Sequence, residues 1–444
     1  MSIEMPELQQ WLEARPSLIG IAQADVRLLA QYVETGGSLL RALGPKLSRS
    51  CEQLRTAKLI HETCRLLRRQ FLDLHAEWVY YILTNGLTVR KGLQELVFEA
   101  AELCAGLVPT SAEIALEKNQ LQINKEGFEI DQGLFFHALL RSPKIGTHLI
   151  ESARQPTARA LGLIDSFCNE AQLNLGCVAI ERRGCAAYLT MNNGYCLNAE
   201  DDCLVDDIET AVDLALLDGN VKVGVLRGGI MTHPRYAGRR VFSAGLNLKA
   251  LRAGQISFVG CMLRREFGYI NKIVRGLRLD DELVEGYKKQ ASKGAVEKPW
   301  IAAVDGFAIG GGAQLLLIAD RVIAASDSYF SLPAAHEGII AGFSNQRLAR
   351  FLGSRKARQV ILKGRKIWAN EPDAQLLIDE VVNPGDLEAA IEQNIYQLAT
   401  SAVVANRHML NVAEEPLATF LQYAAEFAFV QAERLYSEDV LGKT

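Results

Sequence analysis

Two short glycine-containing segments carry backbone amides that could stabilise a negatively charged oxygen. In the segment VFSAGLNLK at 241–249, Ala244 and Gly245 permit a sharp turn close to a ligand. The second segment is the triple glycine at 310–312, which follows an apolar strand-like run and begins a helix-like one. Amides at a helix N-terminus favour negative charge. Either turn alone is more often a site of close packing, but the two together, each after a buried strand, indicate a pair of donors for one carbonyl oxygen.

The sequence around both turns alternates between short apolar runs and helical patterns, which is typical of an α/β core. Helices are predicted over 205–217, where several apolar residues share a face, and over AQLLLIAD at 313–320. We therefore predict an α/β catalytic core over residues 176–385. Its strand-like runs are CVAIERRG (177–184), AAYLTMN (186–192), VKVGVLRG (221–228), PWIAAVDG (299–306), RVIAA (321–325) and YFSL (329–332).

Helical patterns flank this core on both sides. Within residues 1–175, apolar residues from Ile60 to Trp78 recur at spacings of four and three, which predicts a helix over about 50–84 that stops at Asn85-Gly86. We expect this N-terminal domain to serve assembly or lid packing, with a separate catalytic domain as the alternative. Residues 386–444 are expected to form a helical oligomerisation or lid segment, with an apolar face that includes Phe420, Ala424, Phe427 and Val430.

Composition excludes several classes of protein. The chain has 444 residues, of which 49% are apolar and 23% charged, as in a soluble globular protein. Its 48 Lys and Arg residues against 52 Asp and Glu give a net charge of −4, so we expect neither nucleic acid nor a membrane as the main partner. The first residues lack the features of a secretory signal, and we expect a cytoplasmic protein. The nine cysteines form no C-x-x-C pair and are expected to be reduced packing thiols.

The two turns resemble the paired motifs of the crotonase (enoyl-CoA hydratase/isomerase) superfamily, F-x-A-G-A-D-[LI] and G-x-x-x-G-G-G. The resemblance covers about residues 180–385 and implies a crotonase-like ββα superhelix core. By motif position, it implies that the amides of Leu246 and Gly311 form an oxyanion hole for an acyl-CoA thioester. Loss of one such donor typically costs about 2.7–4 kcal/mol of transition-state stabilisation, so two of them can make a thioester enolate accessible without a metal.

Both carboxylates that position water in the hydratases of this superfamily are replaced. The corresponding positions hold Gln314 and Ala334. An amide does not take up a proton at working pH, and a methyl group neither donates nor accepts a hydrogen bond, so hydration by the usual pair is not expected. His336 and Glu337 lie just beyond and could substitute, with a structural role as the alternative. The general base is left open between Glu200, His336, Glu337 and a phenolate of the substrate.

These departures resemble one branch of the superfamily, the cofactor-independent oxygenases of aryl-acetyl-CoA thioesters. The stretches THPRYAGRRVFSAGLNL (232–248), RREFGYI (264–270) and Gly-Gly-Gly-Ala-Gln carry this resemblance, which spans nearly the whole chain. It implies that (3,5-dihydroxyphenyl)acetyl-CoA reacts with O2 to give 3,5-dihydroxyphenylglyoxylate and coenzyme A, for the dihydroxyphenylglycine of glycopeptide antibiotics. The resemblance also implies that no metal or organic cofactor takes part. The sequence is compatible with this, since its 7 histidines give no 2-His-1-carboxylate set and no dinucleotide fingerprint is present.

The resemblance implies roles for further residues. Glu200 is expected against a ring hydroxyl, Gln314 at the other end of the ring or against the intermediate, and Arg265 against a substrate oxygen. The alternatives are a surface role near a helix start for Glu200, helix packing for Gln314 and a surface ion pair for Arg265. Leu248 is expected to wall an apolar niche for O2, with core packing as the alternative. Arg235 suits a coenzyme A phosphate, with an exposed loop that binds no ligand as the alternative. The expected substrate-binding residues are His233, Pro234, Arg235, Tyr236, Ala244, Gly245, Asn247, Leu248 and Lys249.

Two other functions stay open at this point. One is a different aryl-acyl-CoA enzyme of the same fold, namely an isomerase, a thioesterase or a decarboxylase. The other is a noncatalytic acyl-CoA-binding or assembly scaffold, which the missing carboxylates would suit. The resemblance to crotonases also implies a homo-oligomer, either a trimer or a dimer of trimers.

Overall fold

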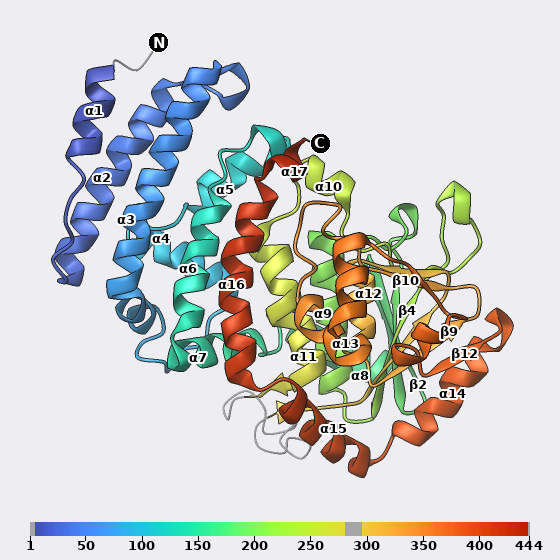
Figure 1. Ribbon diagram of the computed structural model, residues 1–444. Helices are drawn as coiled ribbons and strands as arrows, with labels where there is room; N and C mark the ends of the chain where they lie inside the picture. The colour runs from blue at the N-terminus through green and yellow to red at the C-terminus, as the bar shows by residue number, and fades with distance from the viewer. Residues whose placement is uncertain (1–4, 280–294, 443–444) are drawn as a thin grey trace. The chain divides into compact units, whose positions relative to one another are not determined.

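The computed structural model describes residues 5–279 and 295–442 and divides into two compact units (Figure 1). Unit 1 comprises Met1–Leu149, Leu251–Val259 and Ala424–Thr444, and unit 2 comprises Ile150–Ala250 and Gly260–Tyr423. The three-part division expected from the sequence stays a prediction. The described helices that lie in unit 1 or reach into it are α1 (Met5–Glu13), α2 (Ala22–Ala42), α3 (Cys51–Leu83), α4 (Leu93–Leu103), α5 (Ser111–Lys118), α6 (Glu129–Arg141), α7 (Pro143–Ala153), α10 (Leu248–Arg252), α16 (Leu417–Leu435) and α17 (Glu438–Leu441).

The long helix α3 of unit 1 begins and ends where the sequence predicts. The Ser50 side chain accepts a hydrogen bond from the Gln53 amide, and the Gln53 side chain accepts one from the Ser50 amide, so the two form a capping box. At the other end, Asn85 and Gly86 both adopt positive φ angles, 45° and 67°. The left-handed pair stops the helix because its backbone cannot continue the right-handed winding.

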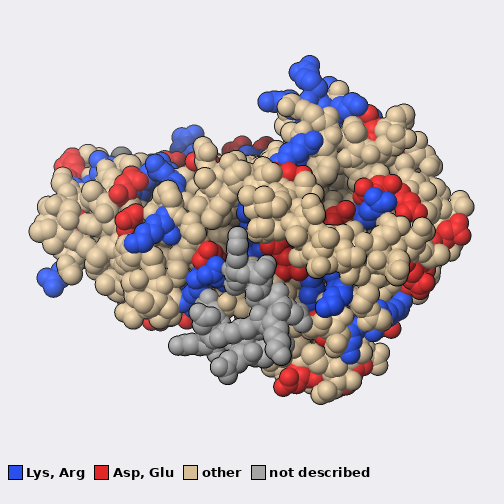
Figure 2. Space-filling model, turned by 90° about the horizontal axis from the view of Figure 1, so that it is seen from below, with Lys and Arg blue, Asp and Glu red and all other residues tan. Residues whose placement is uncertain are grey.

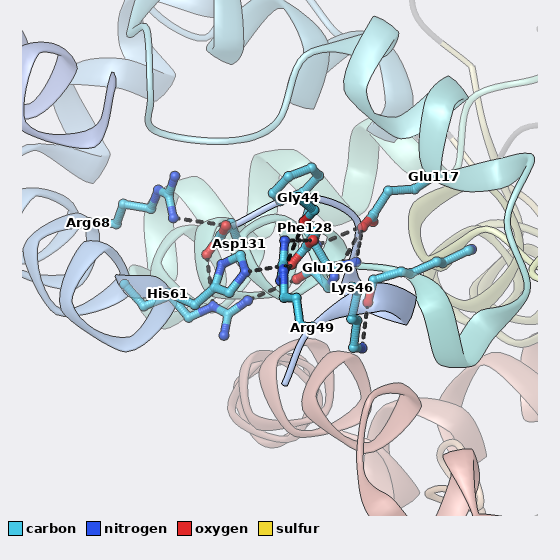
Figure 3. Close-up of polar contacts among 12 residues, drawn as sticks. Gly44, Lys46, Arg49, His61, Arg68, Glu117, Glu126, Phe128 and Asp131 are labelled. Atoms are coloured by element: carbon cyan, nitrogen blue, oxygen red, sulfur yellow. Dashed lines mark hydrogen bonds and ion pairs between the residues drawn. The ribbon is translucent and has the colours of Figure 1, made fainter. Parts of the chain in front are cut away.

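A partly buried polar cluster ties the loop at 125–128 to the helices of unit 1 (Figure 3). Arg49 donates to both carboxylate oxygens of Glu126, at 3.0 and 2.6 Å, and the amides of residues 126–128 donate to the Glu117 carboxylate. Almost every charge therefore meets an opposite charge or a backbone dipole within the cluster. We call this set the Glu126 cluster, and its members are Arg49, His61, Arg65, Arg68, Glu117, Glu126 and Asp131.

Unit 2 is built on a seven-stranded sheet with the order β1-β2-β3-β4-β7-β9-β12. The pairs β1–β2 and β2–β3 are antiparallel, and the remaining pairs are parallel. A three-stranded sheet has the order β11-β10-β8, and β5 pairs with β6. The strands are β1 (Gln172–Asn174), β2 (Val178–Arg183), β3 (Ala186–Met191), β4 (Val223–Gly228), β5 (Leu277–Arg278), β6 (Ala295–Val296), β7 (Trp300–Val304), β8 (Phe307–Ile309), β9 (Arg321–Ala325), β10 (Tyr329–Ser331), β11 (Ile367–Trp368) and β12 (Glu380–Val382).

Helices cover both faces of the seven-stranded sheet, with α8 (Ala158–Glu170) and α9 (Asp202–Leu217) on one side and α14 (Leu387–Leu398) on the other (Figure 1). In register, Tyr188 of β3 lies beside Val225 of β4, which lies beside Ile301 of β7. These side chains are buried in one apolar cluster with Ile391 of α14. Within the described residues, the other helices of unit 2 are α11 (Asn271–Arg275), α12 (Gly311–Leu316), α13 (Ser344–Lys363) and α15 (Ser401–Glu414).

The α/β core with helical segments on both sides is confirmed, while three details of the prediction are wrong. The helix predicted over 313–320 ends at Leu316, because the chain turns there toward β9. The strands β1, β5, β6, β8, β11 and β12 were not predicted, since each has only two or three residues and no clear alternation. Phe420, Ala424 and Phe427 are buried within the single chain, so they do not offer a free apolar face to a partner.

Within the described residues, none of the helices combines the length and the hydropathy needed to cross a bilayer. Over most of the face shown in Figure 2, basic and acidic side chains are interspersed among other residues, and basic side chains gather on the protrusion at its top.

Candidate active site

The two glycine turns meet at β8. Ser243 forms a parallel bridge with Ala308 of β8, and the triple glycine directly follows this strand. The turns are so close that a Cβ atom on Gly245 would lie 2.9 Å from the amide nitrogen of Gly311 and 2.6 Å from the carbonyl oxygen of Ile309. Gly245 also has a φ of +79°, which side chains rarely tolerate. Glycine is therefore required here both for the turn and for the close approach.

The amides of Leu246 and Gly311 lie outside the hydrogen bonds that hold these turns. In the bridge between Glu200 and Leu246, the Glu200 amide donates to the Gly245 carbonyl at 2.7 Å, and the Asn247 amide donates to the Glu200 carbonyl at 2.8 Å. In α12, the first intrahelical bond runs from the Gln314 amide to the Gly310 carbonyl, so the Gly311 amide precedes it. The two turns are thus adjacent, and neither of these amides takes part in the hydrogen bonds that hold them. That both donate to one ligand oxygen stays a prediction.

A buried polar group surrounds the Gly311 side of this pair. A Cβ on Gly311 would lie 2.2 Å from Oε2 of Glu200, so the carboxylate is in direct contact with the second turn. Glu200, Arg265 and Gln314, all predicted for the site, come from different parts of unit 2 and meet here with exposed fractions of 3%, 5% and 2%. We call the set of Glu200, Arg265, Glu266, Tyr269 and Gln314 the Arg265 cluster.

Arg265 is the centre of this cluster and makes five hydrogen bonds. Its Nε and Nη2 donate to the two carboxylate oxygens of Glu200, at 2.6 and 3.1 Å, and Nη1 donates to Glu266 at 2.9 Å. The remaining bonds go to the side-chain oxygen of Gln314, at 2.8 Å, and the carbonyl of Gly311, at 2.7 Å. A guanidinium group has five N–H donors, so in this arrangement Arg265 positions the other groups rather than offering a free donor to a substrate oxygen.

Gln314 is fixed from both ends of its amide group. Its oxygen accepts from Arg265, and its Nε2 donates to both oxygens of Glu266, at 2.8 and 2.7 Å. A glutamate at this position would lose the donor and place a second carboxylate against Glu266. The hydrogen bonds therefore explain why an amide, and not the carboxylate of a hydratase, fits next to Arg265 and Glu266.

Electrostatics hold the cluster in a defined charge state. Burial opposes the charge on Arg265, but Glu200, Tyr269 and Glu266 raise its pKa well above the ordinary value. Burial raises the pKa of Glu266, although Arg265 and Arg347 act in the opposite direction. Burial also raises the pKa of Tyr269 well above its ordinary value, so its hydroxyl stays protonated and donates to Glu200 at 3.4 Å.

A stretch of π-helical winding positions Arg265, Glu266 and Tyr269. Residues Phe258–Leu263 and Glu266–Ile270 have this wider winding, which is rare and occurs often at functional sites, and the second segment is kinked at Gly268, whose φ of −87° and ψ of −108° are not helical. Gly268 lies in the segment Glu266–Ile270, and a Cβ atom on it would lie 2.5 Å from Oε1 of Glu209. Glu209 in turn binds Lys272 at 2.8 Å. The packing of this stretch against α9 therefore depends on a glycine and a buried ion pair.

Glu266 and Tyr269 were not predicted as members of the site. Both lie in the run RREFGYI, from which only Arg265 was selected. The sequence signal that could have identified Glu266 is its place beside Arg265 in a largely apolar stretch, because a charged residue that becomes buried there needs a partner of opposite charge. Tyr269 could not be assigned from an α-helical pattern, since π-helical winding changes which residues share a face.

The other expected residues lie around the first turn or away from it. Tyr236 packs against Phe307 of β8, with ring centroids 5.5 Å apart, and the Arg235 guanidinium lies 5.5 Å from the Tyr236 ring. Leu248 is half-buried at the start of α10, and its role as a wall of the oxygen niche stays a prediction, as do the binding roles of its neighbours. His336 is exposed and lies against Gly364 at the end of α13, so it is not part of the Arg265 cluster.

Comparison with known proteins adds to this geometry. A family model described as enoyl-CoA hydratase/isomerase matches residues 181–432. The chain is 52% identical, over 419 residues, to (3,5-dihydroxyphenyl)acetyl-CoA 1,2-dioxygenase of Amycolatopsis orientalis, covering 94% of this chain and 95% of the relative. It is 29% identical to short-chain-enoyl-CoA hydratase of Clostridium acetobutylicum, over 52% of this chain and 79% of that protein. A crystal structure of an enoyl-CoA hydratase from Mycobacterium avium subsp. paratuberculosis K-10 matches with a TM-score of 0.48 and 21% identity, covering 61% of this chain and 98% of that one.

The family model covers more than half of the chain and includes both glycine turns. The similarity to the Amycolatopsis protein extends beyond it into the helical N-terminal region. The chain therefore belongs to the enoyl-CoA hydratase/isomerase family.

Proposed function

We propose that this chain is a dioxygenase that converts (3,5-dihydroxyphenyl)acetyl-CoA and O2 to 3,5-dihydroxyphenylglyoxylate and coenzyme A, without a metal or an organic cofactor. The observation that supports this most directly is the contact between the two glycine turns, with Glu200 beside Gly311. The 52% identity to a protein of this name supports the choice of substrate. The product would serve the synthesis of dihydroxyphenylglycine for glycopeptide antibiotics.

The first step forms an enolate. The amides of Leu246 and Gly311 donate to the thioester oxygen, and a proton leaves the benzylic Cα. Negative charge then develops on the thioester oxygen, where two preorganised donors in a water-poor site stabilise it most. The resorcinol ring shares the charge, because it is conjugated with the same carbon. The base is either Glu200, Glu337, His336 or a ring phenolate, and the exposed position of His336 makes it the least suited of these.

The second step consumes O2. One electron passes from the enolate to O2, and the resulting radical pair recombines to form a Cα–O bond. The distal oxygen of this peroxide attacks the thioester carbon, and the carbon–sulfur bond breaks to release the coenzyme A thiolate. Loss of the second Cα proton then cleaves the O–O bond, so that Cα becomes the ketone and the former thioester carbon becomes the carboxylate. The enolate supplies the electrons, and both oxygen atoms of O2 remain in the product.

Recognition of the ring hydroxyls would fall to the Arg265 cluster. Glu200 is held by Arg265 and Tyr269, and it would accept a hydrogen bond from one phenol. Gln314 would meet the opposite end of the ring or the oxygenated intermediate. A site built to bond a hydroxyl rejects the analogue that lacks it, because the buried polar group is then left unpaired. Phenylacetyl-CoA is therefore expected to be a poor substrate.

Parallel measurement of O2 uptake and coenzyme A release tests the proposed reaction. The dioxygenase consumes one O2 for each coenzyme A released and stops under anaerobic conditions. An isomerase, thioesterase or decarboxylase of the same fold would continue without O2. Binding of the thioester without turnover in air would instead indicate a noncatalytic scaffold.

Metal chelation tests the cofactor-free part of the proposal separately. Exhaustive chelation is expected to leave the rate unchanged. Loss of activity that iron restores would show that the reaction depends on a metal.

We further propose that the protein is cytoplasmic and assembles as a trimer or a dimer of trimers, with residues 386–444 contributing to assembly or to a lid. Sedimentation analysis of the intact chain can test the oligomeric state.

A further inference from the structure

Two cysteines of unit 2 lie side by side close to Glu200. The Sγ atoms of Cys177 and Cys203 are 2.8 Å apart, and both residues are free thiols. Cys203 lies in the first turn of α9, three residues after Glu200, and is exposed. Cys177 directly precedes β2 and is half-buried. The pair therefore joins the start of α9 to the start of β2.

Asp207 lies within reach of both thiols, but the geometry argues against a metal site. Its carboxylate and the two sulfur atoms lie within 4.8 Å of one another. A tetrahedral zinc ion with bonds of about 2.3 Å would hold two thiolates roughly 3.8 Å apart, which is farther than the 2.8 Å found here. The Asp207 oxygens also already accept bonds from Arg159 Nη1 and from the Cys177 amide, each at 2.6 Å. Asp207 thus holds the backbone of Cys177 in place beside Cys203.

The two thiols differ in their access to a reagent. Burial raises the pKa of Cys177, and the hydrogen bond to Cys203 and the charge of Asp207 act in the same direction, so Cys177 stays protonated near neutral pH. Cys203 is exposed to solvent. An approaching reagent would therefore meet Cys203 first, with Cys177 behind it.

We propose that Cys177 and Cys203 are a redox modification site that forms a reversible disulfide by exchange with a low-molecular-weight disulfide such as oxidised glutathione. The Cys203 thiolate attacks one sulfur of the reagent, and one molecule of the reagent thiol leaves. Cys177 then gives up its proton and attacks Cys203, which expels the second molecule of the reagent thiol. The two cysteines are oxidised by two electrons, and the reagent disulfide is reduced to two thiols.

The disulfide would restrain the first turn of α9, which lies next to the glycine turn at 244–247. Asp201 caps α9 by accepting a hydrogen bond from the Leu204 amide at 3.1 Å. The Asn247 side chain donates to the same Asp201 carboxylate at 3.1 Å, and the Asn247 amide donates to the Glu200 carbonyl. A covalent bond at Cys203 therefore restrains a helix start that is connected to the turn bearing Leu246, and it slows local opening there.

The experiment treats the full chain with oxidised glutathione, blocks the remaining thiols under denaturing conditions and identifies cross-linked peptides by mass spectrometry. The expected product is one intramolecular link between Cys177 and Cys203, which dithiothreitol reverses and which leaves seven of the nine cysteines blocked. Hydrogen exchange of the first turn of α9 is expected to slow in the oxidised protein. None of these readouts depends on enzymatic activity, so they are independent of the proposed function.

Matched variants separate the roles of the two thiols. Cys177→Ser is expected to retain glutathione on Cys203, because the second thiol that would displace it is missing. Cys203→Ser is expected to form no link and to leave Cys177 unmodified. Cys51→Ser, at an exposed cysteine in unit 1, is expected to behave as the unaltered protein.

Persistent glutathione on Cys203 in the unaltered protein, with no link to Cys177, would overturn the proposal. Equal modification of Cys51 and Cys203 without a link would also overturn it. Stoichiometric Zn2+ binding that protects both thiols and is lost in Asp207→Asn would show instead that this is a metal site.

Discussion

The two units each bury a cluster of charged side chains, and only one of these clusters has the features of an active site. In the Glu126 cluster of unit 1, three arginines face Glu126 and Asp131, and Glu117 receives three amides from the loop that it holds (Figure 3). In the Arg265 cluster of unit 2, one arginine faces two glutamates, and the set touches Gly311. Buried charge alone therefore does not indicate a catalytic site. We expect the catalytic site at the Arg265 cluster because this cluster contacts the turn whose Gly311 amide is predicted to bind a ligand oxygen.

The largest expected effect comes from Gly311→Ala. The new Cβ would lie 2.2 Å from Oε2 of Glu200, so either the carboxylate or the turn must move. We expect O2-dependent coenzyme A release to fall by about a hundredfold to a thousandfold, as on loss of one oxyanion donor. The matched control is Gly162→Ala in α8, where a Cβ meets nothing within 4 Å and activity is expected to be unchanged. Full activity of a folded Gly311→Ala protein would contradict the assigned role.

Removal of the central arginine from each cluster separates stability from catalysis. Arg265→Met leaves the buried Glu200 and Glu266 without their guanidinium partner and is expected to lower the free energy of unfolding by about 3–5 kcal/mol. Arg49→Met removes the arginine bonded to Glu126, which keeps His61 as a partner, and a smaller loss of stability is expected. Turnover per folded molecule is expected to fall by about a hundredfold only in Arg265→Met, because Glu200 and Gln314 are then misplaced. Urea denaturation together with the activity of the folded fraction measures both quantities. Equal loss of turnover in the two variants would abolish the distinction between the clusters.

Gln314→Glu tests the polarity of the Arg265 cluster. The new carboxylate would face Glu266 where Nε2 of Gln314 now donates at 2.8 and 2.7 Å, and we expect oxygenation to fall by about tenfold, equivalent to about 1.4 kcal/mol. Gln122→Glu is the control, since Gln122 is also fully buried and its side chain donates to the Leu435 carbonyl in unit 1. That control is expected to lose stability while its turnover per folded molecule stays the same. Unchanged turnover of Gln314→Glu would remove Gln314 from the site.

The smallest expected effects are two opposite dependences of stability on pH. Burial raises the pKa of Glu117 from 4.5 to about 7. The folded protein therefore keeps this proton over a range in which the unfolded chain releases it, and the free energy of unfolding falls as pH rises from about 4.5 to 7. Glu117→Gln, which resembles the protonated form, is expected to lose this part of the pH dependence in thermal unfolding. An identical pH dependence in the variant would contradict the assignment.

Glu415 is expected to act in the opposite direction. Although burial opposes it, Arg347, Arg275 and Arg350 hold the pKa of Glu415 at about 2, against an ordinary value of 4.5. Its stabilising contribution is present above pH 4.5 and is lost as pH falls toward 2. In Glu415→Gln, the free energy of unfolding is expected to be lower at neutral pH and to change less on acidification. Acid titration of both proteins by circular dichroism measures the difference.

Much of the fold could be predicted from the sequence because its signals are local. The capping residue Ser50, the Asn85-Gly86 stop and the apolar runs that became β3, β4 and β7 each determine structure through their immediate neighbours. Both glycine turns could be located for the same reason, since glycine marks backbone conformations that other residues avoid.

The composition of the Arg265 cluster could not be predicted to the same extent. Its members come from the segment before α9, the π-helical stretch and α12, and their contacts form only when unit 2 folds. No spacing in the sequence indicates that Gln314 faces Glu266 or that Arg265 would have all five donors occupied. The same limit applies to Cys177 and Cys203, which are distant in sequence and show no pairing motif.

The π-helical stretch at 258–270 has one further consequence for how this chain tolerates change. Each extra residue that such winding accommodates shifts the following side chains by about 100° around the axis relative to an ordinary α-helix. The orientation of Arg265 is thus set by how many residues precede it in the stretch as well as by what they are. A one-residue deletion upstream would leave every side chain of the Arg265 cluster in the polypeptide and still disperse the cluster, a kind of damage that a survey of single amino-acid replacements would never sample.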